Sequence, residues 1–244
     1  LLGQNVNAYN FESFRLSDLI LELEKLSGIE RIRYTTSHPN DMTDDLIDVY
    51  KNSKKLMPLV HLPVQSGSDK ILTLMNRKHS IKSYLNTFYK LKNINQNIEF
   101  SSDFIIAYPG EDDNDFKETI KLIDEIKFIN SFSFIFSPRP GTVAANLPLI
   151  NKKISMERLE IIQQKLFNNQ INMNKKYENF EVKVLVENRT DDKSKLFGRS
   201  EHMTSVLFSG KDDLIGKVVK VKINNSNRST LFGEAIEKSN QKVA

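Results

Sequence analysis

The sequence contains no cysteine and no long run of apolar residues. Without cysteine, its 244 residues can form no disulfide, bind no zinc or Fe–S cluster through thiolates, and supply no cysteine nucleophile. No apolar stretch approaches the ~20 residues that cross a bilayer, and no signal peptide is recognisable. We therefore expect a cytoplasmic protein that does not associate with membranes. With only four dispersed histidines, we expect no metal site built from these residues alone.

Composition and charge permit several classes of protein. A hydrophobic fraction of 39% and a charged fraction of 27% suit one large or two smaller globular domains. The net charge of +4 and the pI near 9.0 allow a nucleic-acid partner without arguing for one. Between residues 151 and 176, six Lys or Arg stand against two acids, which a solvated helix face explains equally well. The chain begins with Leu1 rather than Met, so we expect that its natural N-terminus is missing.

Strand-like and helix-like segments alternate through the first part of the chain. This order predicts parallel strands joined by helical crossovers, and both open sheets and (β/α) barrels satisfy it. We expect a helix from Ser17 that ends at Gly28 and a short helix from Thr43 to about Lys51. A third helix is expected from Ser68 to about Lys78, a fourth is capped by Ser80, and a fifth begins at Asn114 or Asp115. The expected strands are the end of one at residues 1–7, then 31–37, 56–64, 100–108 and 132–136.

The pattern of apolar and polar residues changes after a long helix predicted from Ser155 to about Lys176. Short alternating segments punctuated by glycine predict a small β-barrel, such as an OB-like module. The boundary is placed near Lys176, which gives domains 1–176 and 177–244. The five predicted strands are 180–187, 195–200, 205–208, 217–223 and 230–236.

The segment HLPVQSGSD, residues 61–69, runs from a strand through a polar turn into a helix. Gln65 and Ser66 stand where the strand ends, and ligands of parallel α/β folds bind at such ends. The alternative is a turn with Ser68 as the helix N-cap. Polar groups at several strand ends favour one ligand site, although loops are polar in any case: Gln4, Asn5, Ser37, His38, Gln65, Ser66, Glu111 and Arg139.

Individual polar residues allow further expectations. His38, at a strand end before proline, can face a ligand, whereas His61 is expected to be a core or supporting residue. His79 and His202 are expected at ordinary surface positions. Asp103 lies inside a strand and needs a partner, so it faces the mouth of a barrel or pairs with an arginine such as Arg33.

Aromatic and basic residues mix in the C-terminal module. Base stacking together with phosphate contact is how small β-barrels hold RNA, but each phenylalanine can equally belong to the core. The residues are Phe197, Arg199, Phe208 and Phe232. The chain has no Walker-type loop and no GxGxxG sequence.

Several segments, in order, closely resemble the MiaB-type tRNA methylthiotransferases, which are radical S-adenosylmethionine (SAM) enzymes. The segments are LLGQNVNAY (1–9), RIRYTTSHP (31–39), HLPVQSGSDKILTLMNRKHS (61–80), SSDFIIAYPGE (101–111) and SFIFSPRPGT (133–142), followed by LFGRSE (196–201) and LFGEAIE (231–237), which resemble a TRAM domain. The resemblance implies an α/β fold: the later part of a (β/α) partial barrel that lacks its first strand, then a small all-β TRAM barrel.

The resemblance also implies a reaction, the methylthiolation of C2 of N6-isopentenyladenosine at position 37 of tRNA. The family uses SAM and two [4Fe–4S] clusters whose cysteine ligands lie upstream of Leu1, so this chain alone should be inactive. The implied partners are tRNA and an electron donor such as flavodoxin or ferredoxin, and we expect a monomer.

The family's functional positions map onto individual residues here. Gly3, Gln4 and Asn5 correspond to the edge that binds the SAM methionine, and the segment 103–111 corresponds to the one behind the adenosine, with Ala107 in place of the usual glycine. The predicted RNA-binding residues are Phe197 and Arg199. The predicted cofactor-binding residues are Gly3, Gln4, Asn5, Ser37, His38, Gln65, Ser66, Asp103 and Arg139, the last for a carboxylate or phosphate at the mouth.

Three alternative functions stay open. The first is the related methylthiotransferase branch that acts on threonylcarbamoyladenosine-37, although TTSHP together with LPVQSGSD favours the isopentenyladenosine branch. The second is a non-catalytic RNA-binding protein that keeps the barrel as a scaffold. The third is a (β/α) barrel enzyme with a phosphorylated small substrate, against which the lack of a phosphate-binding glycine loop argues.

Overall fold

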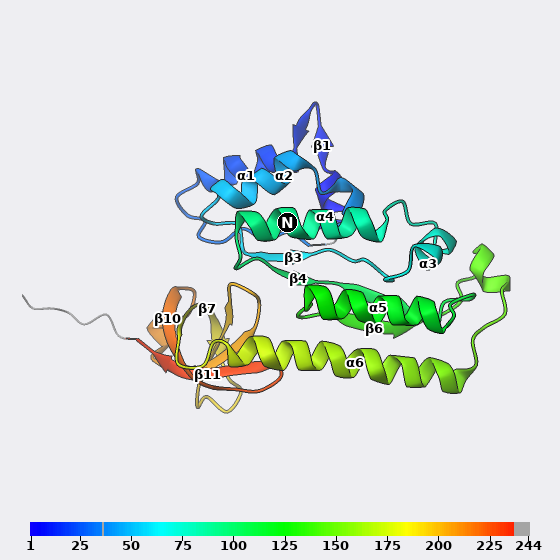
Figure 1. The fold of residues 1–244 in the computed structure, drawn as a ribbon. Coiled ribbons are helices and arrows are strands. Elements are labelled where there is room, and N and C mark those ends of the chain that lie inside the picture. Colours follow the sequence, from blue (N-terminus) through cyan, green and yellow to red (C-terminus); the bar gives the residue numbers. More distant parts are fainter. Residues whose placement is uncertain (36, 237–244) are drawn as a thin grey trace, which may run out of the picture. The chain divides into compact units, whose positions relative to one another are not determined.

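The computed structural model describes residues 1–35 and 37–236. Thr36 of the TTSHP motif and Glu237 of the LFGEAIE motif lie outside these described residues. The chain divides into two compact units after Leu166, within helix α6 (Lys152–Lys175). Figure 1 shows the helices around parallel strands in the first unit and the small barrel of the second. The domain boundary near Lys176 stays a prediction.

Parallel strands form the centre of the first unit. β3 (Leu59–His61) pairs with β4 (Glu99–Ser101), and β5 (Asp103–Ile106) pairs with β6 (Phe132–Ile135), in both cases parallel. Isolated parallel bridges add Ile32 to Leu56, and Gln65 to Phe104. Backbone pairing therefore proceeds in sequence order from Ile32 to β6, as the alternation of strands and helices predicts.

The helices of the first unit begin at the residues that local chemistry favours. Ser68, Ser80 and Asp112 accept backbone hydrogen bonds from the first turns of their helices, while Thr43 occupies the N-cap of α2. The helices are α1 (Leu16–Glu24), α2 (Asp44–Asn52), α3 (Asp69–Leu74), α4 (Ile81–Ile94) and α5 (Asp113–Ile126). Short elements are η1 (Val6–Ala8), the hairpin of β1 (Asn10–Phe11) and β2 (Phe14–Arg15), η2 (Pro39–Asp41) and η3 (Val143–Asn146).

The core of this unit is packed with aromatic rings between the strands and helices. Tyr84, Phe100, Phe104 and Phe128 are fully buried. The ring centroids of Phe104 and Phe128 lie 5.3 Å apart in an edge-to-face arrangement, which stabilises such pairs beyond the area they bury. This core holds the ends of the strands in fixed positions.

Two predicted strands are wrong or much shorter than expected. Residues 1–5 form no strand, and Leu1 and Leu2 are 41% and 87% exposed rather than buried. Among its described residues, 31–35 and 37, the next predicted strand pairs only through the bridge at Ile32. The reason is that a strand needs a hydrogen-bonded neighbour along its length, and residues 1–5 pair with no strand in the described part of the chain.

The second unit contains a closed five-stranded barrel in the order β10-β11-β9-β8-β7. All five strands predicted from the sequence are confirmed. They are β7 (Glu181–Arg189), β8 (Leu196–Ser200), β9 (Ser205–Ser209), β10 (Val218–Ser226) and β11 (Thr230–Ala235), with η4 (Asp212–Leu214) before β10. All pairs are antiparallel except β9 with β11, which is parallel.

The two LFG segments of the barrel need their glycines for close approach of the backbone. A Cβ atom on Gly198 would lie 2.3 Å from the Leu185 carbonyl oxygen, and one on Gly233 would lie 2.2 Å from that of Lys222. Both glycines lie where the pairing register shifts by a residue, in β7–β8 and in β10–β11. The repeated glycine therefore permits the tight curvature of a small barrel.

Candidate functional site

Gln65 lies at the end of the β3 strand segment in a left-handed conformation with φ 72°. Its backbone N–H donates to the Asp103 carbonyl at 3.0 Å, and its carbonyl accepts from the Ile105 N–H at 2.9 Å. The residue is 8% exposed, yet its carboxamide forms no hydrogen bond with any residue that the structure describes. A strained backbone that holds an unused carboxamide at a strand end is typical of a ligand-binding position.

The turn after Gln65 is fixed against helix α5. The Gly67 N–H donates to Thr119 Oγ1 at 2.9 Å, and the Ser68 hydroxyl donates to Asp115 Oδ1 at 2.7 Å while capping α3. Ser66 Oγ accepts from the Ser68 N–H at 3.2 Å. The predicted N-cap at Ser68 is confirmed, and the Ser66 hydroxyl is engaged in holding the turn.

A second loop at this end of the strands joins segments that are far apart in the sequence. Asn7 and His38 exchange two hydrogen bonds, from the His38 N–H to Asn7 Oδ1 at 2.8 Å and from Asn7 Nδ2 to the His38 carbonyl at 2.9 Å. Asn5 Nδ2 donates to Asp41 Oδ2 at 2.7 Å. Beside His38, the Ser37 hydroxyl is buried and unpaired among the described residues. Hydrogen bonds therefore join the loop that carries Asn5 and Asn7 to the loop that carries Ser37 and His38.

His79 belongs to the same cluster, so its prediction as a surface residue is wrong. It is 7% exposed, its ring centroid lies 5.7 Å from that of His38, and its Nε2 lies 3.3 Å from the Val64 carbonyl. Burial lowers the pKa of His79, and the nearby His38 and Arg77 lower it further.

The sequence held a local signal for this burial. His79 precedes the N-cap Ser80, and residues at that position commonly pack on the fourth residue of the helix. Here that residue is Tyr84, whose ring centroid lies 6.2 Å from that of His79. His202, also predicted at the surface, is 8% exposed, and its Nδ1 lies 2.6 Å from the Tyr177 hydroxyl oxygen in the second unit.

Asp103 pairs with a histidine rather than with an arginine. Its Oδ2 lies 3.7 Å from His61 Nε2, and His61 Nδ1 lies 3.0 Å from the Ser101 hydroxyl. Both Asp103 and His61 are half-buried. His61 therefore supports Asp103 at the start of β5, next to the backbone of Gln65.

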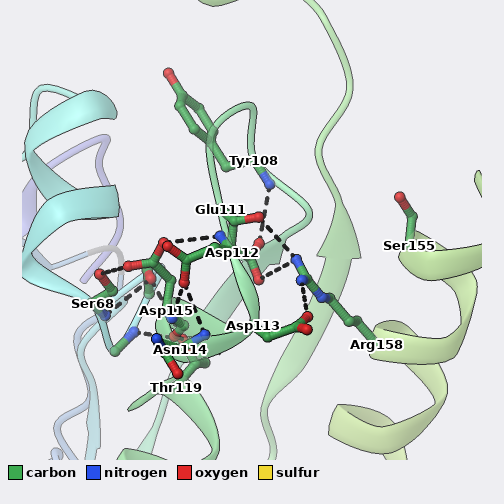
Figure 2. Close-up of polar contacts among 12 residues, drawn as sticks. Ser68, Tyr108, Glu111, Asp112, Asp113, Asn114, Asp115, Thr119, Ser155 and Arg158 are labelled. Carbon is green, nitrogen blue, oxygen red and sulfur yellow. Dashed lines mark hydrogen bonds and ion pairs between the residues drawn. The ribbon is translucent and has the colours of Figure 1, made fainter. Parts of the chain in front are cut away.

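Glu111 turns away from the cluster of Gln65 and His38 toward helix α6. Figure 2 shows Arg158 between Glu111 and Asp113, with distances of 3.3 Å to Glu111 Oε1 and 2.7 Å to Asp113 Oδ1. Burial raises the pKa of Glu111 to about 7 although Arg158 opposes the shift. The buried pair fastens the 109–113 loop to α6, so Glu111 is a structural residue here.

Three other predicted residues are exposed. Gly3 and Gln4 are in exposed coil. Arg139 is exposed in a turn closed by Thr142, whose N–H and hydroxyl both donate to the Arg139 carbonyl, at 3.2 and 2.8 Å. No hydrogen bond or ion pair of the described residues joins these three to Gln65 or His38. No group of three or more His, Asp or Glu suited to a metal ion occurs within 1–35 and 37–236.

The second unit carries a row of apolar side chains on the outside of its barrel. Phe197 pairs with Leu207, which in turn pairs with Phe232, and all three are half-buried. Arg199 lies 5.3 Å from the Phe197 ring centroid and Lys195 lies 5.7 Å from that of Phe232. Phe208, by contrast, is fully buried in the core. The predicted pair Phe197 and Arg199 therefore faces outward together.

Comparison with known families agrees with the division of the chain into two units. Residues 3–123 match the Radical SAM superfamily, and residues 175–236 match the TRAM domain. The chain therefore contains a radical SAM domain followed by a TRAM domain. Within the radical SAM match lie all the predicted cofactor-binding residues except Arg139, and the TRAM match contains the outward row of the barrel.

The chain is similar to several proteins that carry the same name. It is 64% identical over 248 residues to the tRNA-2-methylthio-N(6)-dimethylallyladenosine synthase of Pelagibacter ubique (strain HTCC1062), a match over 100% of the chain and 56% of the relative. Synthases of the same name are 47% identical in Vesicomyosocius okutanii (97% of the chain, 55% of the relative) and 44% identical in Orientia tsutsugamushi strain Ikeda (96% and 54%). The chain thus spans about half the length of the curated relatives it matches.

Proposed function

We propose that this chain is the SAM-binding and tRNA-binding part of a tRNA methylthiotransferase that acts on N6-dimethylallyladenosine, also called N6-isopentenyladenosine. The names of the similar synthases support this choice of substrate. The two family matches support the assignment of SAM binding to the first unit and of tRNA binding to the second. The observation that carries the cofactor assignment is the buried carboxamide of Gln65 at a strand end, which has no partner among the residues that the structure describes. The parallel strands of the first unit would be part of a radical-SAM-type (β/α) partial barrel.

The residues at the strand ends fit the polar groups of SAM. Its methionine end and ribose need a few placed donors and acceptors, and the Gln65 carboxamide and the Ser37 hydroxyl are both unpaired among the described residues. Bound beside an Fe–S cluster, SAM supplies the radical chemistry and the methyl group of the reaction. These 244 residues contain no cysteine, so cluster thiolates would come from outside them. A flavodoxin- or ferredoxin-like electron donor and a monomeric state stay predictions.

Replacement of Gln65 tests the cofactor assignment in the complete, cluster-loaded protein. We expect Gln65→Ala to weaken SAM binding by at least about tenfold, because one hydrogen bond to a charged group contributes about 1.5–3 kcal/mol. Isothermal titration with SAM measures the change. Gln96→Ala, an exposed glutamine after α4, is the matched control. Equal affinity in the two variants would remove Gln65 from the cofactor site.

The outward row of the TRAM barrel is proposed to stack on RNA bases. Phe197→Ala should weaken binding of a labelled RNA hairpin by about 1–3 kcal/mol, the usual contribution of one stacked base. Fluorescence anisotropy of the 244-residue chain measures the affinity. Ile215→Ala removes another exposed apolar side chain of the same unit and serves as control. Affinity should also fall steeply with added salt, and a flat response would contradict phosphate contacts.

A further inference from the structure

A polar groove in the first unit adjoins His38 and His79. It has a volume of about 710 Å³ and lies between the loop at Pro39, the start of α2 and one side of α4. Three cationic residues line it, Arg77, Lys78 and Lys90, against a single carboxylate, Asp44. Pockets for small molecules are mostly apolar with few polar groups. This groove therefore has the lining of a site for an anion.

The position of Arg77 is fixed by the end of helix α3. Asn76 adopts the left-handed conformation with φ 55°, its N–H donates to the Thr73 carbonyl at 2.9 Å, and the Arg77 N–H donates to the Leu72 carbonyl at 2.8 Å. These two bonds form a Schellman motif, which fixes the direction of the chain after a helix. The Arg77 side chain therefore enters the groove from a rigid backbone.

Arg77 has no acceptor among the residues that the structure describes. Its guanidinium is half-buried and forms no hydrogen bond or ion pair with them, and burial lowers its pKa. Taking a cation partly out of water without a partner costs free energy, which a bound anion would offset. Lys78 and Lys90 differ, since their ammonium groups contact Asn76 Oδ1 at 2.9 Å and Asp44 Oδ1 at 2.6 Å.

A second unpaired group lines the same groove. His79 is nine-tenths buried, and its Nδ1 has no hydrogen-bond partner within the described part of the chain. An unsatisfied buried polar atom costs about 1–3 kcal/mol, so a polar ligand or an ordered water in the groove would remove a real penalty. The N-terminus of α4 contributes less, because the Ile81 N–H already donates to Asp69 Oδ1 at 2.7 Å.

We propose that this groove binds the sugar–phosphate backbone of RNA, with the Arg77 guanidinium on a phosphate. The lining extends along α4 from Ser80 to Lys90, about 15 Å at 1.5 Å per residue, which is longer than one phosphate and suits successive phosphates of a strand. The inference rests on the proposed function and adds to it a contact surface on the radical SAM unit, separate from the TRAM barrel.

Substitution of Arg77 tests the groove in the 244-residue chain. The probe is a fluorescent RNA hairpin with N6-dimethylallyladenosine in its loop, titrated by anisotropy at several salt concentrations. Arg77→Gln should weaken binding about tenfold and lower the slope of log affinity against log salt by about 0.7–0.9, the value of one phosphate contact. Lys121→Gln, an exposed cation on α5 outside the groove, should bind within about twofold of the unsubstituted chain.

A substitution that removes a negative charge from the groove distinguishes an effect of charge from damage to the fold. Asp44→Asn removes the carboxylate of the groove and frees Lys90, so RNA affinity should rise about two- to threefold. Simple structural damage would lower affinity instead. Thermal unfolding followed by circular dichroism checks that each variant is folded.

Each outcome decides the proposal. If Arg77→Gln binds RNA as tightly as the unsubstituted chain does, the proposal is overturned. This holds even if inorganic phosphate binds in a way that depends on Arg77, because the groove would then be a site for small anions. If Phe197→Ala weakens RNA binding and Arg77→Gln does not, the groove inference fails while the proposed function stands. If the unsubstituted chain binds no RNA, both fail.

Discussion

At the scale of single residues, two residues with left-handed backbone stand where strands of the first unit end. Gln65 and Ala107 both have positive φ, 72° and 55°. For an L-residue the left-handed region costs about 1–2 kcal/mol, and such outliers gather at functional sites. Ala107 occupies the position where the resembling family has glycine, so the same backbone turn persists here without that residue.

Replacement of Ala107 by glycine should be nearly neutral. Relief of the left-handed strain roughly offsets the lost buried methyl group and the added freedom of the unfolded chain, so the change in unfolding free energy should be within about 1 kcal/mol. Ala144→Gly, a buried alanine without positive φ, should lose about 1–2 kcal/mol. Urea unfolding of both variants measures the difference. Equal losses would show that Ala107 carries no strain.

Glu111 should make stability depend on pH in a defined window. Its folded pKa of about 7 lies above the ordinary value of 4.5, so between these values the folded protein keeps a proton that the unfolded chain releases. The contribution of Glu111 to stability therefore falls as pH rises from 4.5 to 7. Burial of the carboxylate causes this dependence.

Comparison with Glu111→Gln isolates that contribution. The difference in unfolding free energy, unsubstituted chain minus variant, should fall by about 1 kcal/mol or more between pH 5 and pH 7. His38 and His79 titrate in both proteins and cancel in the difference. Glu118→Gln, at an exposed position of α5, is the control. A difference that is constant with pH would mean that Glu111 is not buried as described.

Local chemistry predicted some residues and missed others. The N-cap role of Ser68 depends on neighbours within three residues, and the sequence shows it. The burial of His79 depends on the His38 ring from another loop as well as on Tyr84. The pairing of Asp103 with His61 likewise joins residues 42 positions apart, which no short pattern reveals. Long-range contacts of this kind need the folded structure.

At the scale of elements, the joint between the β3 turn and helix α5 depends on Gly67. A Cβ atom there would lie 2.4 Å from Thr119 Cα and 2.7 Å from the Glu118 carbonyl oxygen, both of them backbone atoms. Backbone of a packed helix cannot yield as a flexible side chain can. The glycine therefore sets how closely α5 approaches the turn that carries Gln65.

Substitution of Gly67 should move helix α5 and the turn that carries Gln65 apart. We expect Gly67→Ala to cost about 2–3 kcal/mol of stability and to weaken SAM binding through movement of Gln65. Gly28→Ala is the matched control, because a Cβ at Gly28 meets nothing within 4 Å. Urea unfolding and SAM titration of the complete protein report both effects. A Gly67→Ala protein as stable as Gly28→Ala would contradict the packing of α5 on this turn.

Elements were predicted best where one face is apolar and the pattern is regular. The five barrel strands alternate along their length, so their positions were confirmed. The segment at residues 1–7 has apolar Leu1 and Leu2 but pairs with no strand of the described residues, and its prediction as a strand end was wrong. Apolar composition alone does not create a strand without a partner.

At the scale of the whole molecule, the chain combines two compact units with different surfaces. The first presents polar strand ends and a cationic groove, and the second presents an aromatic and basic row on a closed barrel. No described helix is both long and apolar enough to cross a bilayer. Under the function proposed above, both surfaces would bind RNA.

The most direct test of this account is the nucleoside composition of tRNA in cells. The complete protein is expressed in a bacterium that lacks its own methylthiotransferase, and tRNA is digested and examined by mass spectrometry. We predict that 2-methylthio-N6-dimethylallyladenosine appears with the unsubstituted protein and falls sharply with Gln65→Ala. Persistence of unmodified N6-dimethylallyladenosine, or methylthiolation of threonylcarbamoyladenosine instead, would contradict the proposed function.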